Sequence, residues 1–342
     1  MNVTKGTHQN VPTCSYPFIE FDSDLVTIYI YLMILPIISI FGIFTALLSI
    51  FVFTRRKMRS SSLNVYLAWL SFFDLILLLF SILVFTPMQA CHELGYVNNI
   101  ICQFHWFSTP YTMTILNIAH VGSVWTCVVV SIDRFIAVKY PLHSKIWCTP
   151  KRAVKILSSL TVVIIIYQLP GFFEYAQHYC GYVLDSELAK NPYYQKFYVM
   201  YCYLLLRICI PWAIMIILNV FIVKFIREAK KMRLIRLNSQ TNLSSDKSVR
   251  CSKMAIVIIA TFLIFNSLAA INNISIPLEL GFPKQLIPIG NTLVCIYSAF
   301  NFLIYAWFSP RFRKMCAVLL CKRDRQWKAW LNTESTRWSF SN

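Results

Sequence analysis

The sequence predicts an all-α membrane protein: a bundle of seven transmembrane helices with a short amphipathic helix after the last span. Of its 342 residues, 57% are hydrophobic and 13% are charged, which is about half the charged share of a soluble domain. Seven apolar stretches each approach the roughly 20 residues that an α-helix needs to cross a bilayer. Because lipid offers no partner to backbone N–H and C=O groups, these stretches are predicted to be helices. The alternating pattern of a membrane β-barrel is absent from the sequence.

The predicted spans follow one another along most of the chain. They lie at residues 26–53, 63–88, 104–135, 153–172, 196–225, 252–277 and 288–308. Residues 1–25 are polar, so we expect an extracellular N-terminal segment without a cleavable signal peptide, and the first span as the insertion signal. Residues 26–308 form the predicted bundle, and residues 309–342 form a cytoplasmic amphipathic helix and tail.

Lys and Arg cluster on alternate connections, after the first, third and fifth spans and in the tail, which together hold most of the 32 basic residues. The positive-inside rule therefore predicts a multi-pass plasma-membrane protein with its N-terminus outside and its C-terminus in the cytoplasm. This topology accounts for the net charge of +18 without nucleic acid as a partner. The outer connections are rich in Asp and Glu, which favours a cationic ligand by electrostatic steering, although each acid alone also fits a solvated surface. Asn2 begins a glycosylation sequon on the outer side.

Four of the 12 cysteines can reach the oxidising outer side: Cys14, Cys91, Cys102 and Cys180. Cys102 opens the third span and Cys180 lies in the long loop after the fourth. A Cys102–Cys180 bridge is therefore predicted to tie this loop over the mouth of the bundle, and a second bridge between Cys14 and Cys91 is left open. In the tail, Cys316 and Cys321 follow an amphipathic run and are candidates for palmitoylation, with unmodified thiols as the alternative.

Polar side chains inside the spans are the strongest functional candidates, because a charged one costs about 2.5–3.5 kcal/mol to insert at the centre of a membrane helix. Asp74 lies in the middle of the second span, and Ser123 lies in the third. Asp133 and Arg134 close the third span at its cytoplasmic edge. An arginine there can pair with the neighbouring aspartate or swing to another partner, as an ionic switch does. The alternative is a plain salt bridge at a helix end.

Taken together, these residues resemble the rhodopsin-like G protein-coupled receptors over residues 26–320. The matching pieces are residues 70–74, 133–135, 141–142 and 301–305, with Pro211 in the fifth span and Cys180 in the outer loop. Residues 123–138 and 262–266, with Pro110, look most like the FMRFamide-type neuropeptide receptor branch. The resemblance implies a receptor that binds an extracellular neuropeptide, an amidated FMRFamide-like one, and transmits binding to an intracellular heterotrimeric G protein.

The resemblance also implies the residues of the G protein switch. Asp133, Arg134, Asn301 and Tyr305 are expected to form it, and Leu142 is an expected hydrophobic contact in the loop after the third span. Arrestin is a further expected partner, although Ser and Thr are sparse in the tail.

A buried sodium ion is the one cofactor that the resemblance suggests. Asp74, Ser123 and Asn301 match three positions of the family's sodium site, and their oxygens suit a hard cation. Tyr297 stands where a small polar residue is expected, so a dry hydrogen-bonded network is the alternative.

The sequence departs from the family pattern at two places, and each departure predicts a local change in a helix. Asn266 and Leu268 stand where the sixth span usually has a tryptophan and a kinking proline, so the pivot of this helix is expected elsewhere. Cys102 lies a turn or two farther from Asp133 than usual, so the top of the third span is expected to be irregular around Pro110.

Candidate ligand contacts lie in the outer third of the predicted bundle. An Arg-Phe-amide peptide end carries a delocalised cation and an aromatic ring, so its pocket needs a carboxylate, aromatic faces and amide acceptors. The candidates are Glu174, Glu279, Trp106, Tyr111, Phe85, Asn117, His120, Asn273 and Asn291. Arg207 is a cation within the fifth span, and it is expected to face the bundle and either pair with an acid or repel the ligand's arginine. For each of these residues, a structural hydrogen bond is the alternative.

Other classes of membrane protein fit the sequence less well. No His-Glu-x-x-His metal motif or Gly-x-Ser-x-Gly nucleophile motif occurs, and Asp74 is the one carboxylate in the middle of a span, so an enzyme is not expected. Channels use re-entrant filters and transporters use paired broken helices, and the sequence indicates neither. The alternatives are a receptor of the same fold for a chemosensory or lipid ligand and, in another class, a membrane transporter or channel.

Overall fold

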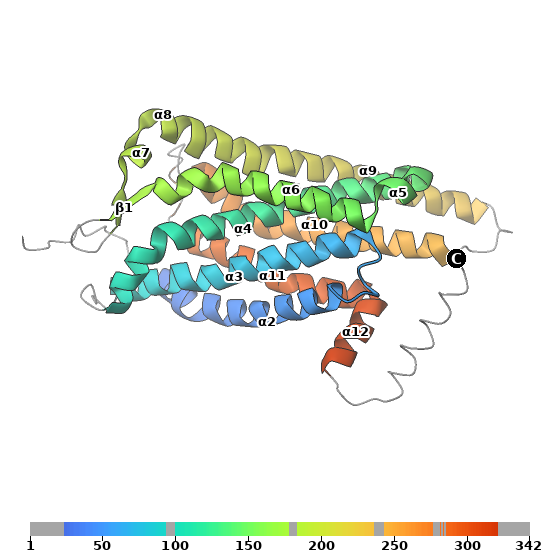
Figure 1. Cartoon of the computed structure of the whole chain (residues 1–342), viewed down its shortest axis with the longest axis horizontal. Helices are drawn as coiled ribbons and strands as arrows, with labels where there is room; N and C mark the ends of the chain where they lie inside the picture. The colour runs from blue at the N-terminus through green and yellow to red at the C-terminus, as the bar shows by residue number, and fades with distance from the viewer. Residues whose placement is uncertain are drawn as a thin grey trace, which may run out of the picture.

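Seven long helices run side by side along the bundle in the computed structural model of the chain (Figure 1). The structure describes residues 24–93, 100–177, 183–235, 243–275 and 285–320, with residues 281 and 283. Within this part of the chain, 7 helices are long and apolar enough to cross a membrane. These spans are Leu25–Phe53, Ser62–Cys91, Cys102–Lys139, Pro150–Phe173, Pro192–Ala229, Val249–Ser275 and Leu286–Phe308. The predicted fold class is therefore confirmed. Outside the described residues lie Asn2, Cys14, Cys180, Glu279 and Cys321.

The elements follow the predicted order. The first four spans contain α1 (Leu25–Tyr29), the π-helix η1 (Ile30–Ile34), α2 (Leu35–Phe53), α3 (Ser62–Glu93), α4 (Ile100–Lys139), α6 (Pro150–Gln168) and the 3-10 helix η2 (Leu169–Phe173). The later spans contain α8 (Pro192–Tyr194), the π-helices η3 (Gln195–Cys202) and η4 (Leu204–Cys209), α9 (Ile210–Ile235), α10 (Leu243–Ser275) and α11 (Leu286–Phe308). The connections contain α5 (Pro141–Trp147), β1 (Tyr175–Gln177), β2 (Val183–Asp185) and α7 (Glu187–Lys190), and α12 (Pro310–Leu320) follows the last span as predicted.

The bundle has two distinct ends (Figure 1). At the hairpin end, β1 and β2 pair antiparallel with Tyr175 opposite Asp185. At the other end, here called the α12 end, the chain turns after α11 and α12 begins. Ser309 is extended and its hydroxyl accepts a hydrogen bond from the backbone N–H of Phe312 (3.2 Å), so this serine caps the new helix.

Two prolines shape the helices differently. The helix α4 runs without a break from Ile100 to Lys139 across Pro110, so the irregularity expected there is wrong at the level of helix continuity. In the fifth span, Pro211 lacks the N–H that a π-helical turn would offer to the carbonyl of Leu206. The indole N–H of Trp125 donates to that carbonyl instead (3.1 Å). The π-helical segment η4 is thereby tied to α4.

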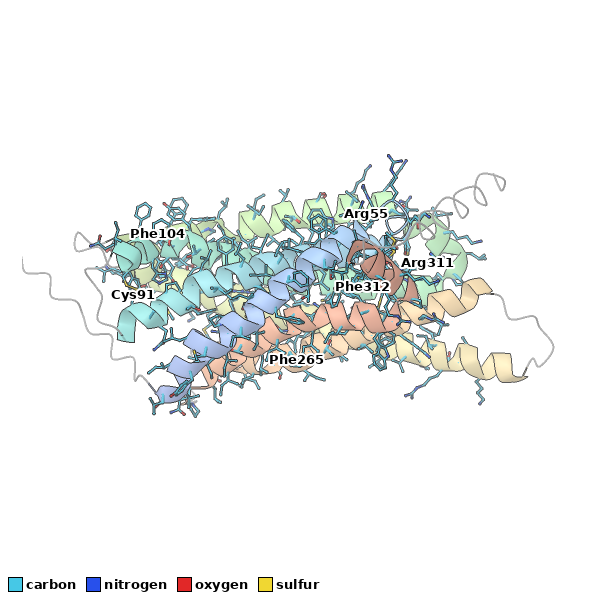
Figure 2. All side chains as sticks on the ribbon, turned by 90° about the horizontal axis from the view of Figure 1, so that it is seen from below. Arg55, Cys91, Phe104, Phe265, Arg311 and Phe312 are labelled. Atoms are coloured by element: carbon cyan, nitrogen blue, oxygen red, sulfur yellow. A yellow bond between two sulfur atoms is a disulfide. The ribbon has the colours of Figure 1, made fainter. Side chains whose placement is uncertain are left out.

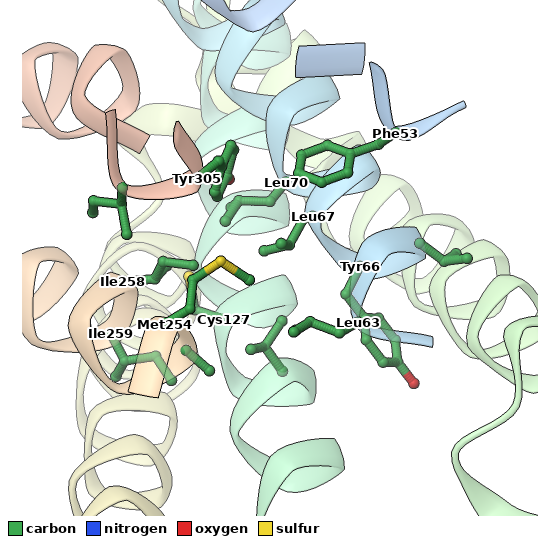
Figure 3. Packing of buried hydrophobic residues seen from close by; sticks show 14 of the residues in the cluster. Phe53, Leu63, Tyr66, Leu67, Leu70, Cys127, Met254, Ile258, Ile259 and Tyr305 are labelled. Carbon is green, nitrogen blue, oxygen red and sulfur yellow. The ribbon is translucent and has the colours of Figure 1, made fainter. Parts of the chain in front are cut away.

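The largest hydrophobic cluster lies between the helices toward the α12 end (Figure 3). Phe53, Tyr305 and Phe312 are almost fully buried there, and the Phe53 ring lies 5.1 Å from Tyr305 and 5.0 Å from Phe312. Fully burying one such aromatic side chain contributes about 1.5–3 kcal/mol. These rings attach α12 to the first and last spans.

Spans three and seven are central and spans four and five are peripheral. Of their most apolar windows, 56% of residues are buried in each of spans three and seven, compared with 17% and 22% in spans four and five. The side chains that point outward are largely apolar, as expected of a lipid-facing surface. Figure 2 shows Arg55 and Arg311 near one end of the bundle, and Cys91 and Phe104 near the other.

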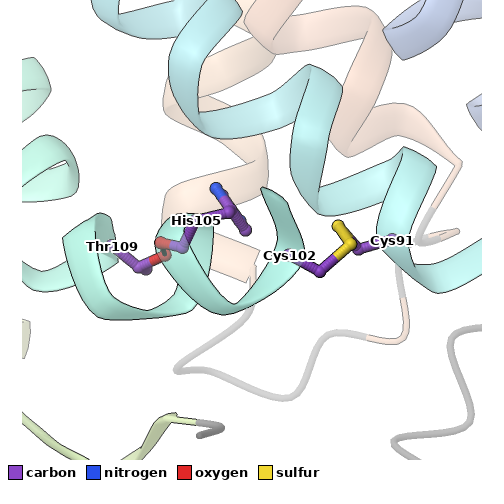
Figure 4. Close-up of a disulfide and its surroundings, with 4 residues drawn as sticks. All are labelled: Cys91, Cys102, His105 and Thr109. Atoms are coloured by element: carbon purple, nitrogen blue, oxygen red, sulfur yellow. Dashed lines mark hydrogen bonds between the residues drawn. A yellow bond between two sulfur atoms is a disulfide. The ribbon is translucent and has the colours of Figure 1, made fainter. Parts of the chain in front are cut away.

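A disulfide joins Cys91 of α3 to Cys102 of α4, with a Cα–Cα distance of 5.8 Å (Figure 4). The predicted Cys102–Cys180 bridge is therefore wrong, and so is the possible second bridge between Cys14 and Cys91, because each sulfur forms one such bond. The physical reason is the early start of α4. Cys102 lies beyond the usual position on the third span, beside the end of the preceding antiparallel helix, and the cysteines are separated by only 11 residues in sequence.

Candidate functional site

A cavity of about 350 Å³ opens among the helices toward the hairpin end. Its wall includes residues from α3, α4, α6, η2, the fifth span, α10 and α11. Its size falls within the usual range of ligand pockets, about 300–1,000 Å³. The cavity is therefore the candidate ligand pocket.

Seven of the ten predicted ligand contacts line this pocket: Phe85, Asn117, His120, Glu174, Arg207, Asn273 and Asn291. Tyr111 is not among the lining residues; it is 52% exposed and packs against Phe172. Trp106 also lies off the pocket, where it packs on His105. Glu279 belongs to the residues that the structure does not describe. Tyr111 and Trp106 were expected from their depth in the span, and the rotation of α4 turns them away from the cavity.

Arg207 is the most unusual lining residue, because it is a buried cation inside a membrane helix. Its side chain is on η4, the residue is 8% exposed, and its guanidinium lies over the ring of Tyr203 at 4.4 Å. Its Nη2 donates to Asn117 Oδ1 (3.1 Å) and contacts His120 Nδ1 (3.2 Å). Because Asn117 and His120 are one helical turn apart, a single face of α4 offers both acceptors.

The contacts of His120 fix its tautomer and extend the network to α10. A guanidinium can only donate, so Nδ1 must be the acceptor and the ring proton must lie on Nε2. Nε2 then donates to Asn266 Oδ1 (3.2 Å), and Asn266 Nδ2 donates to the carbonyl of Phe262 (2.9 Å). A neutral His120 thus connects the fifth span, α4 and α10 beside the pocket. The sequence did not predict Asn266 as part of a site.

Tyrosines form a second part of the pocket wall that was not predicted. Tyr167, Tyr198 and Tyr203 line the cavity, and Tyr198 donates to the carbonyl of Tyr167 at 2.5 Å. Glu174 accepts a hydrogen bond from Tyr194 (2.7 Å), whose ring stacks on Tyr198. The many tyrosines of residues 193–203 could have indicated this wall in the sequence. The sequence does not show which of these rings face the lipid and which face the pocket, because that depends on the orientation of the helix.

A second polar cluster surrounds Asp74 in the middle of the bundle. Its carboxylate accepts hydrogen bonds from Ser123 (3.3 Å), Ser298 (3.0 Å) and Asn301 (2.8 Å). Ser298, which the sequence did not predict here, adds a hydroxyl from α11. The residue beside it, Tyr297, points its hydroxyl at Cys127 Sγ instead (3.4 Å). The Asn301 Oδ1 atom is buried and has no hydrogen-bond partner among the described residues.

Asp133 and Arg134 form a buried ion pair near the α12 end. Arg134 Nε donates to Asp133 Oδ2 (3.0 Å), and Nη2 donates to the same oxygen. The two residues are 4% and 6% exposed, and Ser62 donates to the same carboxylate oxygen at 3.3 Å. The expected pairing is therefore present, with Ser62 as an additional partner. Nearby, burial and the adjacent Asp133 raise the pKa of the Cys148 thiol to about 12.

The remaining predicted switch residues have contrasting exposures. Tyr305 is fully buried, and its hydroxyl has no hydrogen-bond partner among the described residues. Leu142, on α5, is 76% exposed, which suits a contact with another protein. Cys316 is 8% exposed and packs in the large cluster, and burial raises its pKa to about 11. A buried, protonated thiol is a poor nucleophile, so these observations do not favour Cys316 as a palmitoylation site.

Comparison with known proteins identifies the family. The profile of the family described as "7 transmembrane receptor (rhodopsin family)" matches residues 45–305. The chain belongs to this family. Membership confirms the resemblance found in the sequence, and it confirms a receptor and not an enzyme.

Rhodopsin-family relatives with related sequences include three invertebrate receptors. The "FMRFamide receptor" of Drosophila melanogaster is 27% identical over 305 residues, which cover 85% of this chain and 54% of that receptor. The "FMRFamide peptide receptor frpr-18" of Caenorhabditis elegans is 26% identical over 307 residues, covering 83% of this chain and 67% of that protein. The "Sex peptide receptor" of Drosophila melanogaster is 22% identical over 336 residues, covering 86% and 74%. The chain spans about half the length of the Drosophila FMRFamide receptor.

As a rhodopsin-family member, the chain departs from the family pattern in its sixth span. The sixth span, α10, contains no proline and runs unbroken through Asn266 and Leu268. Asn266 occupies the position where a tryptophan was expected, and there it bonds to His120. A hydrogen-bonded link between α4 and α10 therefore replaces the bulky ring next to the pocket.

Proposed function

We propose that this chain is a plasma-membrane receptor for an extracellular amidated peptide and that it signals to a heterotrimeric G protein. The pocket carries the proposal: it combines one carboxylate, several tyrosines and side-chain amides in a cavity toward one end of a seven-helix bundle. Two relatives whose names include FMRFamide support an Arg-Phe-amide peptide end as the part that enters the pocket. In that arrangement Glu174 pairs with the ligand's arginine and the tyrosines pack against its phenylalanine.

The proposed orientation places the hairpin end outside the cell and the α12 end in the cytoplasm. Arg55 and Arg311 lie near the same end of the bundle (Figure 2), as the positive-inside rule requires of the cytoplasmic side. The disulfide lies at the opposite end, where an oxidising environment would preserve it. Antibody access to tags at the two termini of intact cells tests this orientation, and access to the C-terminal tag without permeabilisation contradicts it.

Signalling in this proposal is a shift between two packings of the bundle. Ligand binding changes contacts near Arg207 and His120, and α10 transmits the change toward the α12 end. There Arg134 leaves Asp133 and receives the G protein, while exposed Leu142 provides a hydrophobic contact. Arrestin would bind the same end after phosphorylation of the tail.

A sodium ion fits the Asp74 cluster as part of this proposal. The Asp74 carboxylate, the hydroxyls of Ser123 and Ser298 and the unpartnered Asn301 Oδ1 are all buried oxygen donors, which suit a hard cation. The ion would neutralise Asp74 in the inactive packing. Thermal unfolding of the purified receptor tests this: sodium should stabilise the wild type more than a larger organic cation does, and Asp74→Asn should remove the difference.

One experiment decides the main proposal. Cells that express the full chain are exposed to a panel of amidated peptides, and nucleotide exchange on G proteins is measured. Peptides ending in Arg-Phe-amide should drive exchange in wild-type cells and not in cells without the chain. Exchange driven only by lipids or odorants would instead favour the chemosensory or lipid alternative, and ion current or substrate flux without a G protein would favour a channel or transporter.

A further inference from the structure

We propose that Arg207 binds an anionic group of the ligand, a carboxylate, so that the pocket recognises a ligand with both a positive and a negative group. This inference rests on the proposed peptide receptor and specifies its ligand further. The resemblance to FMRFamide receptors suggests the opposite, because an Arg-Phe-amide end has no carboxylate of its own.

Arg207 is buried, and no residue in the described part of the chain neutralises it. Its described polar partners are the neutral side chains of Asn117 and His120, both contacted through Nη2. The buried Nε has no partner, and no described residue accepts a hydrogen bond from Nη1. No carboxylate in the described part of the chain forms an ion pair with this guanidinium. A desolvated cation with unused donors is a site for an anion from outside the chain.

The shape of the guanidinium specifies the kind of anion. Its N–H groups lie in one plane, as a fork that matches the two oxygens of a carboxylate. The Tyr203 ring already holds the guanidinium in place, so little conformational freedom is lost when the anion binds. Both Arg207 and Tyr203 line the pocket, so the anion can reach this site through the proposed ligand cavity.

The two charges of the pocket lie at different depths. Glu174 lines only the larger cavity, next to the strand β1. Arg207 and His120 also line a second, smaller hollow that continues to Trp212 and Phe262. A ligand that satisfies both charges therefore has its cation toward the hairpin end and its anion deeper in the bundle. Such a carboxylate would also compete for the Arg207 donors that now hold His120, and His120 connects to α10 through Asn266.

Matched peptide pairs test the assignment on the full-length receptor. One series ends in Arg-Phe-amide and carries either Asp or Asn at each upstream position, and a second series compares a free C-terminal acid with its amide. These two series separate a side-chain carboxylate from a terminal one. We expect one acid to be at least tenfold more potent than its neutral partner on the wild type, equivalent to about 1.4 kcal/mol. Arg207→Gln should abolish this preference, and Arg207→Lys should retain part of it.

Asn291→Leu is the matched control, because Asn291 is a polar lining residue whose amide bonds to Tyr31 and not to Arg207. It should change the potency of both members of a pair by the same factor. The proposal is overturned if acids and neutral partners are equally potent on the wild type, or if Arg207→Gln weakens both members equally. Surface expression is measured for each variant, and Arg207→Lys preserves the comparison if Arg207→Gln does not reach the surface.

A second measurement separates this proposal from the proposed function. If no peptide of either series activates the wild type, the peptide-receptor proposal fails, and Arg207 is then tested without signalling. Thermal unfolding of the purified receptor is measured with acetyl-aspartyl-amide and with acetyl-asparaginyl-amide. Stabilisation of the wild type by the acid alone, lost in Arg207→Gln, supports the anion site. Equal effects of the two compounds, or an acid effect that survives Arg207→Gln, refute it.

Discussion

Each end of the bundle buries an arginine, and the two arginines differ in the groups that surround the charge. Arg134, toward the α12 end, is paired with the neighbouring Asp133, which also accepts from Ser62. Arg207, toward the hairpin end, has neutral acceptors and an unpartnered Nε. The charge of Arg134 is therefore neutralised within the protein, by Asp133. Arg207, which has no ion-pair partner among the described residues, lines the cavity, where the proposed anion of a ligand would neutralise it.

The packing around the two arginines also differs, because one end of the bundle is filled and the other contains a cavity. Near the α12 end, the rings of Phe53, Tyr305 and Phe312 fill the space between the first span, the last span and α12. The hairpin end contains the cavity and is held instead by the Cys91–Cys102 disulfide and by hydrogen bonds such as that of Tyr194 to Glu174. A covalent bond and a few polar contacts can hold helix ends around a hollow, whereas close packing requires the hollow to be filled.

The largest expected effect breaks the paired arginine. Arg134→Ala should abolish ligand-driven nucleotide exchange, because it removes the group that is proposed to receive the G protein. Surface expression and ligand binding should remain close to wild type, since Asp133 keeps the hydroxyl of Ser62 as a partner. Exchange assays and radioligand binding on the same membranes measure the two outcomes. Full signalling by this variant would remove Arg134 from the switch.

The disulfide is the next test, because it holds only the hairpin end. Cys91→Ser and Cys102→Ser should each lower the free energy of unfolding by about 2–4 kcal/mol, and the double variant should be no worse than either one. Thermal unfolding of the purified receptor measures this loss. Mass spectrometry of a non-reduced digest should find Cys91 joined to Cys102. A peptide joining Cys102 to Cys180 would restore the pairing expected from the sequence.

Reversing the charge of Glu174 tests whether this acid, in contrast to Arg207, binds the cation of the ligand. Glu174→Lys should weaken an Arg-containing peptide by about 2 kcal/mol or more if the carboxylate pairs with it in a desolvated site. The same peptide with its arginine replaced by a neutral residue should be much less sensitive. Competition binding with both peptides provides the comparison. An equal loss for the two peptides would mean that Glu174 only steers the ligand.

The smallest expected effect concerns the link from Arg207 to α10. Asn266→Leu removes the acceptor of His120 Nε2 and leaves a buried donor unpaired, at a cost of about 1–3 kcal/mol. Basal nucleotide exchange should rise, because α10 loses a contact with α4. The neighbouring Ser267→Ala is the matched control, since that hydroxyl bonds only within α10, to the carbonyl of Ile264 (2.7 Å). A rise of the same size in both variants would exclude a specific role for the link.

Much of the architecture was predictable from the sequence because a bilayer limits which stretches of a chain can cross it. Any helix that crosses it needs a long apolar stretch, so the seven spans and their order were predictable without knowing a single contact. Local pairs were predictable for a similar reason. Asp133 and Arg134 are adjacent in sequence, and Asn117 and His120 are one turn apart, so each pair lies close together in any helix that contains it.

Contacts between helices were decided by tertiary structure, since they depend on how each helix is rotated and where it begins. The rotation of α4 turns Tyr111 to the surface while Asn117 faces the pocket. The early start of α4 brings Cys102 to Cys91 and excludes its pairing with Cys180. The π-helical turn before Pro211 lies where Arg207 meets His120. The composition and spacing of the sequence determined that this chain spans a membrane seven times. Only the packed bundle decided which buried charge has a partner among the described residues, because pairing depends on the distance between two side chains in space.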